Sequence, residues 1–259
     1  MFMAEILPTF LAAGQAGLAL IGRAVLPVLF PFFVLTTLLL NLIPTHNKWV
    51  VAGLAYISGY PNGTRMTKSL YDQGVIDAPT ARHLCVLTST PSPFFLIATV
   101  GTLFLQNTWH GLLIFLCAVV AAIINGWLWR PSKPTGQPVV TCHQPTQHLP
   151  FFTAFSQALA SATSAILNVC GVVLFFYILA QMLHLPAWLA GLLEMTTGVA
   201  GTTNLLLIEF LVCLGGLSVA LQNFLFTDGL QIKFGYYLSY KLTHAIIACG
   251  LLAVCLFFL

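Results

Sequence analysis

Charged side chains are scarce in this sequence, which has nine Lys and Arg and six Asp and Glu among 259 residues, or 6%. A water-soluble domain is typically about one quarter charged, because its surface has to stay hydrated. The low charge and the 59% share of hydrophobic residues therefore exclude a soluble globular domain, and they also exclude a disordered chain. The net charge of +3 is too small to indicate nucleic-acid binding.

Signatures of enzymes and metal sites are also missing. The sequence contains no H-E-x-x-H, no P-loop and no G-x-S-x-G, so we expect a protein that is not an enzyme. Six of the seven cysteines lie in apolar runs, which favours small buried side chains over disulfides. Cys142, His143 and His148 could ligate a metal, but no second ligand pair with zinc-type spacing accompanies them, so we expect no bound metal. The N-terminus lacks the basic region and cleavage site of a signal peptide.

Long apolar runs are the dominant feature. At about 20 residues per crossing, the chain has room for roughly six to eight membrane segments and no separate soluble domain. The predicted crossings are 24–43, 83–105, 110–129, 169–185, about 208–226 and about 235–259. The less hydrophobic runs 4–22 and 151–168 predict helices that lie at the membrane interface, the first ending at Arg23. The fold class is therefore an all-α polytopic membrane protein with about six full crossings.

Four interruptions fall inside these apolar regions, at 58–63, 88–93, 194–198 and 215–218. The first and third follow runs too short to cross, so they predict re-entrant hairpins, the first near 49–74. The other two predict discontinuous transmembrane helices. Because an unpaired backbone amide in hydrocarbon costs several kcal/mol, such breaks persist only where protein packs on them or where they line a wet cavity. Together they predict one central site.

The same order of parts occurs twice, in residues 1–129 and 151–259, with a polar linker at 130–150 between them. LPVLFPFFVLTTLL at 26–39 aligns apolar on apolar with CGVVLFFYILAQML at 170–183. Three crossings separate the starts of these two spans, and an odd number makes the second repeat inverted. Most Lys and Arg then gather on the face that holds the linker. The positive-inside rule makes that face cytoplasmic and leaves both termini outside.

The candidate solute ligands are hydroxyls, amides, glycines and charged groups at the four interruptions. They are Ser58, Gly59, Tyr60, Asn62, Gly63, Arg65, Thr88, Ser89, Thr90, Glu194, Thr196, Thr197, Gly198, Gly215, Gly216, Ser218 and Gln222. Glu194 is the sharpest candidate, because a carboxylate among apolar neighbours has to meet a cation, take a proton or bond a ligand. The structural alternative is a carboxylate in a salt bridge or bonded to a helix terminus.

Other ionisable residues have competing interpretations. Arg65 is either a counter-charge for the solute or a side chain that snorkels to the interface. Lys68 is expected at the interface, and Glu209 at the outer surface, where the second hairpin ends. His244 is expected to bond a neighbouring helix, although a buried histidine can also relay protons.

The segments around the interruptions resemble those of the nucleoside-recognition (Gate) domain membrane proteins, and most closely the YlbJ-type sporulation integral membrane proteins. Their sequences are SGYPNGTRMTKSLYDQG, LTSTPSPFFLIATVG, GLLEMTTG, LGGLSVALQ and YKLTHAIIA. The family is distantly similar to concentrative nucleoside transporters, which implies two inverted repeats, each with a hairpin and a discontinuous helix. The resemblance covers nearly the whole chain and implies a small-molecule transporter. In sporulating bacteria the YlbJ-type proteins are linked to moving dipicolinic acid, an aromatic dicarboxylate, into the spore.

The resemblance extends to individual positions. The matching residues are Ser58, Gly59, Tyr60, Pro61 and Gly63 in the first signature, Glu194, Thr196 and Gly198 in the second, and Gly215, Gly216, Ser218 and Gln222 in the third. Arg65 stands where the family often has Lys. The chain departs from the family at Thr88 to Pro91, where Asn and Gly are common, and it is shorter than typical YlbJ-type members.

These observations predict a secondary transporter in a bacterial cytoplasmic membrane, working by alternating access. Its solute is expected to be small and polar, either anionic or heteroaromatic, like a nucleoside or dipicolinate. A coupling ion, Na⁺ or H⁺, is expected in place of a cofactor, and a homodimer or homotrimer in lipid is expected. The alternative is a sensor or assembly subunit that binds without transporting, with the linker 130–150 recruiting a partner.

Overall fold

The structure is a computed structural model that describes residues 2–42, 47–131 and 150–258, and within these ranges the regular elements are all helices. Five helices are long and apolar enough to cross a membrane: Leu7–Leu42, Thr108–Leu128, Phe151–Met182, Leu205–Phe224 and Phe234–Phe258. The shorter helix Phe95–Phe104 is also apolar. The predicted polytopic all-α class is therefore confirmed. Residues 132–149 of the linker, with Cys142, His143 and His148, lie outside the described residues.

Each half begins with one long helix instead of two segments. α1 (Phe2–Leu20) continues through the π-helical turn η1 (Ile21–Val25) into α2 (Leu26–Leu42). α7 (Phe151–Met182) likewise joins the predicted segments 151–168 and 169–185. No break occurs at Arg23, because Leu20 and Leu26 keep right-handed helical dihedrals on either side of the π turn and the Arg23 side chain is exposed. One polar side chain on the outside of a helix does not interrupt its backbone hydrogen bonds.

A helix ends at each of the four predicted interruptions, and in the second half each break is a single residue, Glu194 or Gly215. The first half continues with α3 (Lys48–Ser58), α4 (Asn62–Asp72), α5 (Ala78–Leu87), η2 (Phe95–Phe104) and α6 (Thr108–Leu128). The second half continues with α8 (Ala187–Leu193), α9 (Met195–Ala200), α10 (Leu205–Leu214), α11 (Gly216–Phe224) and α12 (Phe234–Phe258). Both halves therefore consist of a long helix, a helical hairpin, a discontinuous helix and a final helix.

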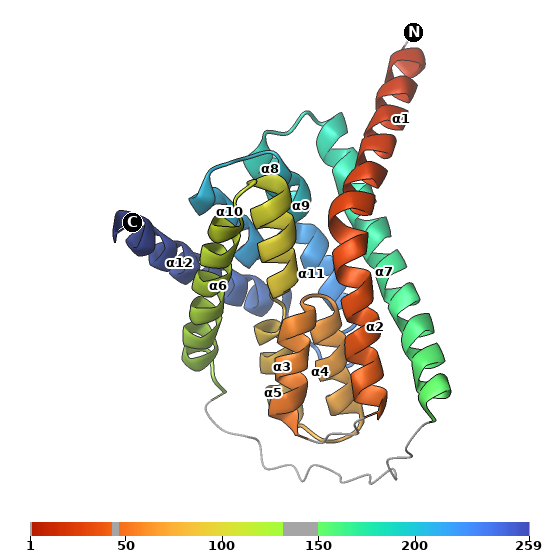
Figure 1. Ribbon diagram of the computed structural model, residues 1–259, viewed down its shortest axis with the longest axis vertical. Helices are drawn as coiled ribbons and strands as arrows, with labels where there is room; N and C mark the ends of the chain where they lie inside the picture. The colour runs from red at the N-terminus through yellow and green to blue at the C-terminus, as the bar shows by residue number, and fades with distance from the viewer. Residues whose placement is uncertain (1, 43–46, 132–149, 259) are drawn as a thin grey trace.

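The two hairpins lie at opposite ends of the molecule. Figure 1 shows α3 and α4 in its lower part and α8 and α9 in its upper part, while α7 lies beside the continuous helix formed by α1 and α2. The main hydrophobic cluster joins η2, α6, α10 and α12 around Leu96, Ile114, Leu211 and Ala248, all at most 1% exposed. This arrangement brings the helix breaks of the two halves toward one another between the long helices and the core.

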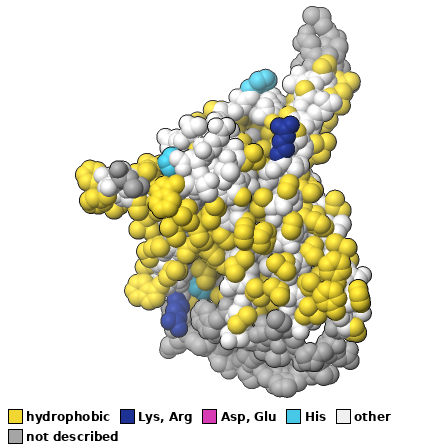
Figure 2. Space-filling model, in the orientation of Figure 1, with side chains coloured by type: hydrophobic (Ala, Val, Ile, Leu, Met, Phe, Trp, Pro, Cys, Tyr) yellow, Lys and Arg dark blue, Asp and Glu magenta, His cyan; other side chains and the backbone are white. Residues whose placement is uncertain are grey.

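The outer surface is apolar across the middle of the molecule. Figure 2 shows a broad band of hydrophobic side chains on the visible face, with Lys, Arg and His atoms above and below it. Large side chains such as Ile123, Trp127 and Phe175 are more than 60% exposed. A water-soluble monomer rarely exposes such a continuous apolar area, whereas lipid tails solvate it at no cost.

Candidate functional site

In the first half, the hairpin break lies directly on the break of the discontinuous helix. The backbone N–H of Tyr60 donates a hydrogen bond to the carbonyl of Thr90 over 2.9 Å. Gly59 has φ +73°, and a Cβ at this position would lie 2.6 Å from the backbone N of Ser92. Glycine is therefore required at position 59 for two reasons: the left-handed backbone conformation and the close approach of the two backbones.

The second half repeats this contact. Gly216 has φ +72°, and a Cβ on it would lie 2.8 Å from the carbonyl oxygen of Gly191 in α8. Gly215, just before it, has φ +83°, which ends α10 in a left-handed residue. Gly198 packs on the backbone of Gly191, which brings α9 against α8. Gly198 and Gly216 therefore bring backbones together, whereas Gly215 ends α10 in the left-handed conformation.

Glu194 is the N-cap of α9. Its Oε1 accepts the N–H of Thr196 over 3.0 Å, and its Oε2 accepts both the N–H and the hydroxyl of Thr197 over 2.6 Å each. The side chain is only 1% exposed. The carboxylate therefore satisfies donors at the start of a helix, which is the structural alternative weighed for this residue.

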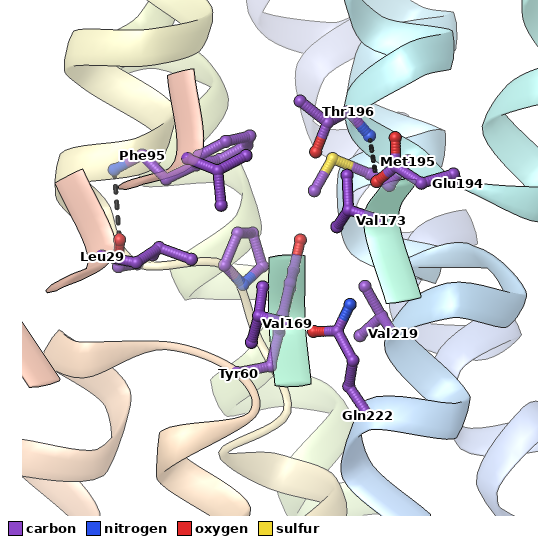
Figure 3. Close-up of a pocket in the computed structure, with 13 residues that line it drawn as sticks. Leu29, Tyr60, Phe95, Val169, Val173, Glu194, Met195, Thr196, Val219 and Gln222 are labelled. Carbon is purple, nitrogen blue, oxygen red and sulfur yellow. Dashed lines mark hydrogen bonds between the residues drawn. The ribbon is translucent and has the colours of Figure 1, made fainter. Parts of the chain in front are cut away.

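A pocket lies where the breaks of both halves meet. Its cavity volume is about 20 Å³, room for about one water molecule, so the two halves close on it in this structure. Its polar side is formed by Tyr60 from the first hairpin, Ser92 from the first discontinuous helix, Glu194 and Thr196 from the second hairpin, and Gln222 from α11. The other lining residues are Val25, Leu29, Pro91, Phe95, Val169, Val173, Met195 and Val219. Figure 3 shows these side chains around the space between the two halves.

Two polar atoms in this pocket have no hydrogen-bond partner within the described part of the chain. They are the hydroxyl of Tyr60 and Oε1 of Gln222, on side chains that are 7% and 2% exposed. In Figure 3 both side chains project into the same pocket that Glu194 lines. Buried polar groups in folded proteins nearly always have partners, so these two are available to a ligand. Both side chains are shielded from bulk water.

Several predicted ligands bond within their own half instead of facing the pocket. Ser58 donates to the carbonyl of Ala55, and Thr88 donates to that of Leu84. Asn62 donates to Thr36 of α2 over 3.0 Å. Gly63 lies against the carbonyl of Thr88, and the buried hydroxyls of Thr90 and Ser218 have no partner among the described residues. Of the seventeen predicted residues, Tyr60, Glu194, Thr196 and Gln222 line the pocket.

Arg65 connects the first hairpin to the long helices. Its guanidinium donates to Asn62 of α4 over 3.1 Å and to Thr37 of α2 over 2.8 Å. It also donates to the carbonyl and the hydroxyl of Ser161 in α7. These contacts direct the charge away from the pocket lining. Lys68 forms a partly exposed ion pair with Asp72, with 2.5 Å between Nζ and Oδ1.

A second polar cluster joins the two halves outside the pocket, and of its members sequence reasoning predicted only Ser89. Asn223 accepts from the hydroxyl of Thr64 over 2.7 Å and donates to Ser89 over 2.7 Å and to Tyr237 over 3.1 Å. Lys241 donates to the carbonyl of Ser89 over 2.5 Å. We call Thr64, Ser89, Asn223 and Tyr237 the Asn223 cluster. The sequence feature that indicates this cluster is Asn223, a second amide side chain next to Gln222 in an apolar segment.

Two charged residues are deeply buried. Glu209 was predicted at the outer surface, but its side chain is 0% exposed, and so is that of Lys241. The prediction for Glu209 was wrong because α10 packs along α12, which covers a position that hydropathy places near a helix end. The imidazole of His244 lies 3.0 Å from the carbonyl of Ala118 in α6, the bond to a neighbouring helix that was expected.

Comparisons with known proteins show one weak similarity. No family model and no solved structure matches the chain. Over 121 residues it is 27% identical to the sporulation integral membrane protein YlbJ of Bacillus subtilis (strain 168). The match covers 39% of this chain and 29% of YlbJ, so the chain aligns with less than a third of that relative's length. With its five apolar helices, this chain is thus an integral membrane protein similar in part to YlbJ.

Proposed function

We propose that the protein is a secondary transporter that carries a small heteroaromatic solute by alternating access, with the pocket between the two halves as its binding site. The observation that carries this proposal is the unpartnered hydroxyl of Tyr60 and amide oxygen of Gln222, which come from opposite halves and face one pocket. A solute bound to both groups would bridge two units that can move relative to each other.

The lining favours a neutral heteroaromatic solute over an anion. The described residues around the pocket include one carboxylate, Glu194, and no Lys or Arg. Arg65 donates to Thr37 and to Ser161 instead. Tyr60 and Phe95 offer aromatic surface, and the valines offer flat apolar walls. Nucleobases and nucleosides combine such a ring with donors and acceptors at its edge, whereas a dicarboxylate would enter next to Glu194 without a cation.

The order of parts supports alternating access. Each half has a hairpin whose break contacts its own discontinuous helix, and the hairpins lie at opposite ends of the molecule. In such an arrangement one hairpin can open the site to one side while the other keeps it closed. We propose accordingly that the two halves are inverted repeats and that the linker lies on the cytoplasmic side.

Ligand binding is tested by thermal unfolding of the purified protein with uridine, adenine or dipicolinate. A compound that binds the folded form at about 100 times its Kd stabilises it by roughly 2.7 kcal/mol, so it raises Tm. We expect uridine or adenine to raise Tm, and Gln222→Ala and Tyr60→Phe to reduce that rise. Tyr237→Phe is the matched control, since its hydroxyl lies in the Asn223 cluster. A rise with dipicolinate alone would contradict the proposed solute class.

Transport itself is tested by counterflow of labelled uridine in proteoliposomes. A transporter exchanges label against unlabelled solute inside, whereas a sensor only binds it. Glu194→Gln is expected to assemble normally and to abolish uptake, because Glu194 lines the pocket. Binding without counterflow would favour the sensor, and unchanged uptake in Glu194→Gln would remove Glu194 from the mechanism.

A further inference from the structure

Glu209 in α10 is a buried acid outside the pocket, and it has few hydrogen-bond donors. Its side chain is 0% exposed. The nearest donor to Oε1 is the thiol of Cys213, with the sulfur 3.7 Å away, and Oε2 has no partner among the described residues. No Lys, Arg or His in the described part of the chain forms an ion pair with it. Glu194, by contrast, accepts three hydrogen bonds over at most 3.0 Å.

The titratable neighbours of Glu209 do not compensate a negative charge. They are Tyr56 on α3, Cys117 on α6, Cys213 on α10 itself and Cys249 on α12. Thiols and phenols are neutral at ordinary pH unless a cation activates them. An ionised carboxylate in this position would therefore be buried without a partner, which is costly enough that the protonated form is favoured.

The two buried basic side chains of α12, Lys241 and His244, form hydrogen bonds to other groups. Lys241 donates to the carbonyl of Ser89, and the Nε2 of His244 bonds the carbonyl of Ala118. The other ring nitrogen of His244 has no partner among the described residues. Within the described residues neither side chain forms an ion pair with the Glu209 carboxyl, and Lys241 interacts electrostatically with Cys213, the thiol that donates to it.

The surroundings suit a proton and not a metal ion. A hard cation such as Na⁺ or Ca²⁺ needs several oxygen ligands, whereas three of the four neighbours of Glu209 are thiols. The described residues contain no group of three or more His, Cys, Asp or Glu side chains that could hold a metal.

A short path connects Glu209 to the pocket. Tyr56 interacts electrostatically with Glu209 and lies next to Thr90 in the first discontinuous helix. The Thr90 carbonyl accepts the N–H of Tyr60, and the buried Thr90 hydroxyl has no partner within the described ranges. Pro91 and Ser92, which follow Thr90, line the pocket. Tyr56 and Thr90 therefore lie between Glu209 and the backbone that carries Tyr60.

We infer that Glu209 is the proton-binding site that couples solute movement to a proton gradient. The inference rests on the proposed transport function. The carboxylate takes a proton while the site is open to one side, the acid form is buried in the closed state shown here, and the proton leaves on the other side. The carboxyl gains and loses one proton per cycle, and no other group is consumed.

The direct test is infrared spectroscopy of the lipid-reconstituted protein, because the C=O stretch of a protonated carboxyl group is separate from the bands of carboxylates. We expect this band in the wild type at neutral pH, its loss in Glu209→Gln and its return at a shifted frequency in Glu209→Asp. Glu194→Gln is the matched control and should keep the band. A wild-type spectrum without the band, or a band that Glu209→Gln leaves unchanged, would overturn the inference.

Coupling is tested in proteoliposomes that contain a pH-sensitive dye, with uridine as the probe. An inward uridine gradient should acidify the interior in the wild type, and Glu209→Gln should reduce this proton movement about tenfold while uridine still equilibrates. Uridine uptake without proton movement in the wild type would overturn the inference and leave the transporter in place. An absence of uridine uptake would count against the proposed function, and the infrared band would then decide whether Glu209 binds a proton.

Discussion

The Asn223 cluster and the pocket are two buried polar regions built from the same kinds of side chain, but only the cluster is fully bonded. Thr64 and Ser89 from the first half meet Asn223 and Tyr237 from the second through bonds of 2.7 to 3.1 Å. In the pocket, Tyr60 and Gln222 each keep an unpartnered oxygen within the described structure. An unsatisfied buried polar group costs about 1–3 kcal/mol of folding free energy. The bonded cluster therefore stabilises the contact between the halves, whereas the two open groups in the pocket lower stability and leave sites for a ligand.

The largest difference between the two regions is expected when two adjacent amide side chains, Asn223 and Gln222, are each replaced by Leu. Asn223→Leu removes the partner of Thr64, Ser89 and Tyr237 at once, so we expect a loss of roughly 3 kcal/mol in the free energy of unfolding. Gln222→Leu removes an oxygen without a partner and should leave stability unchanged or slightly raised. Denaturant unfolding of both variants in the same detergent measures the difference. Equal losses would show that the two regions do not differ.

Two glycines in the first hairpin test how closely the backbone is packed at the edge of the pocket. Gly59→Ala places a methyl 2.6 Å from the backbone of Ser92 and has to keep φ near +73°, so we expect a loss of roughly 2 kcal/mol or more. Gly53→Ala, in the exposed middle of α3, meets nothing within 4 Å and should gain about 0.5 kcal/mol. Thermal unfolding distinguishes them. A tolerated Gly59→Ala would mean that the backbone at the pocket edge can move apart.

Removing the hydroxyl of one of two buried tyrosines is expected to change stability by a smaller amount. Tyr237→Phe removes hydrogen bonds to Ser89 and Asn223 and should cost about 1 kcal/mol. Tyr60→Phe removes a hydroxyl that has no protein partner, so Tm should stay the same while the ligand-induced rise in Tm falls. Measuring Tm with and without uridine separates the two effects. A loss of stability in Tyr60→Phe would point to an ordered water or another partner on its hydroxyl.

Replacing one threonine in each region is expected to give the smallest changes in stability. Thr64→Val loses a hydrogen bond to Asn223 and should cost about 0.6 kcal/mol, the average for side-chain bonds inside membrane proteins. Thr90→Val replaces a buried hydroxyl that has no partner within the described ranges and should be neutral or stabilising. Denaturant midpoints of the two variants provide the measurement. Destabilisation by Thr90→Val would reveal a bond between Tyr56 and Thr90 in solution.

Sequence reasoning located the breaks better than their side-chain partners. Glycine and proline interrupt a helix for local reasons, so the interruptions near Gly59, Pro91 and Gly215 were visible in the chain itself. Glu194 was singled out correctly as a buried polar residue, but its three donors belong to the first turn of α9, whose start was not evident. Glu209 was placed at the surface because hydropathy does not show which helix covers it.

The apolar composition alone determined that this protein lies in a membrane as a set of helices, since hydrocarbon tolerates no unpaired backbone. Local chemistry also determined where those helices end. Only the tertiary structure decided which polar groups find partners: it satisfied Asn223 and left Tyr60 and Gln222 open in a shared pocket. The reason is that a hydrogen bond across two halves depends on how distant helices pack, and packing is a property of the whole chain.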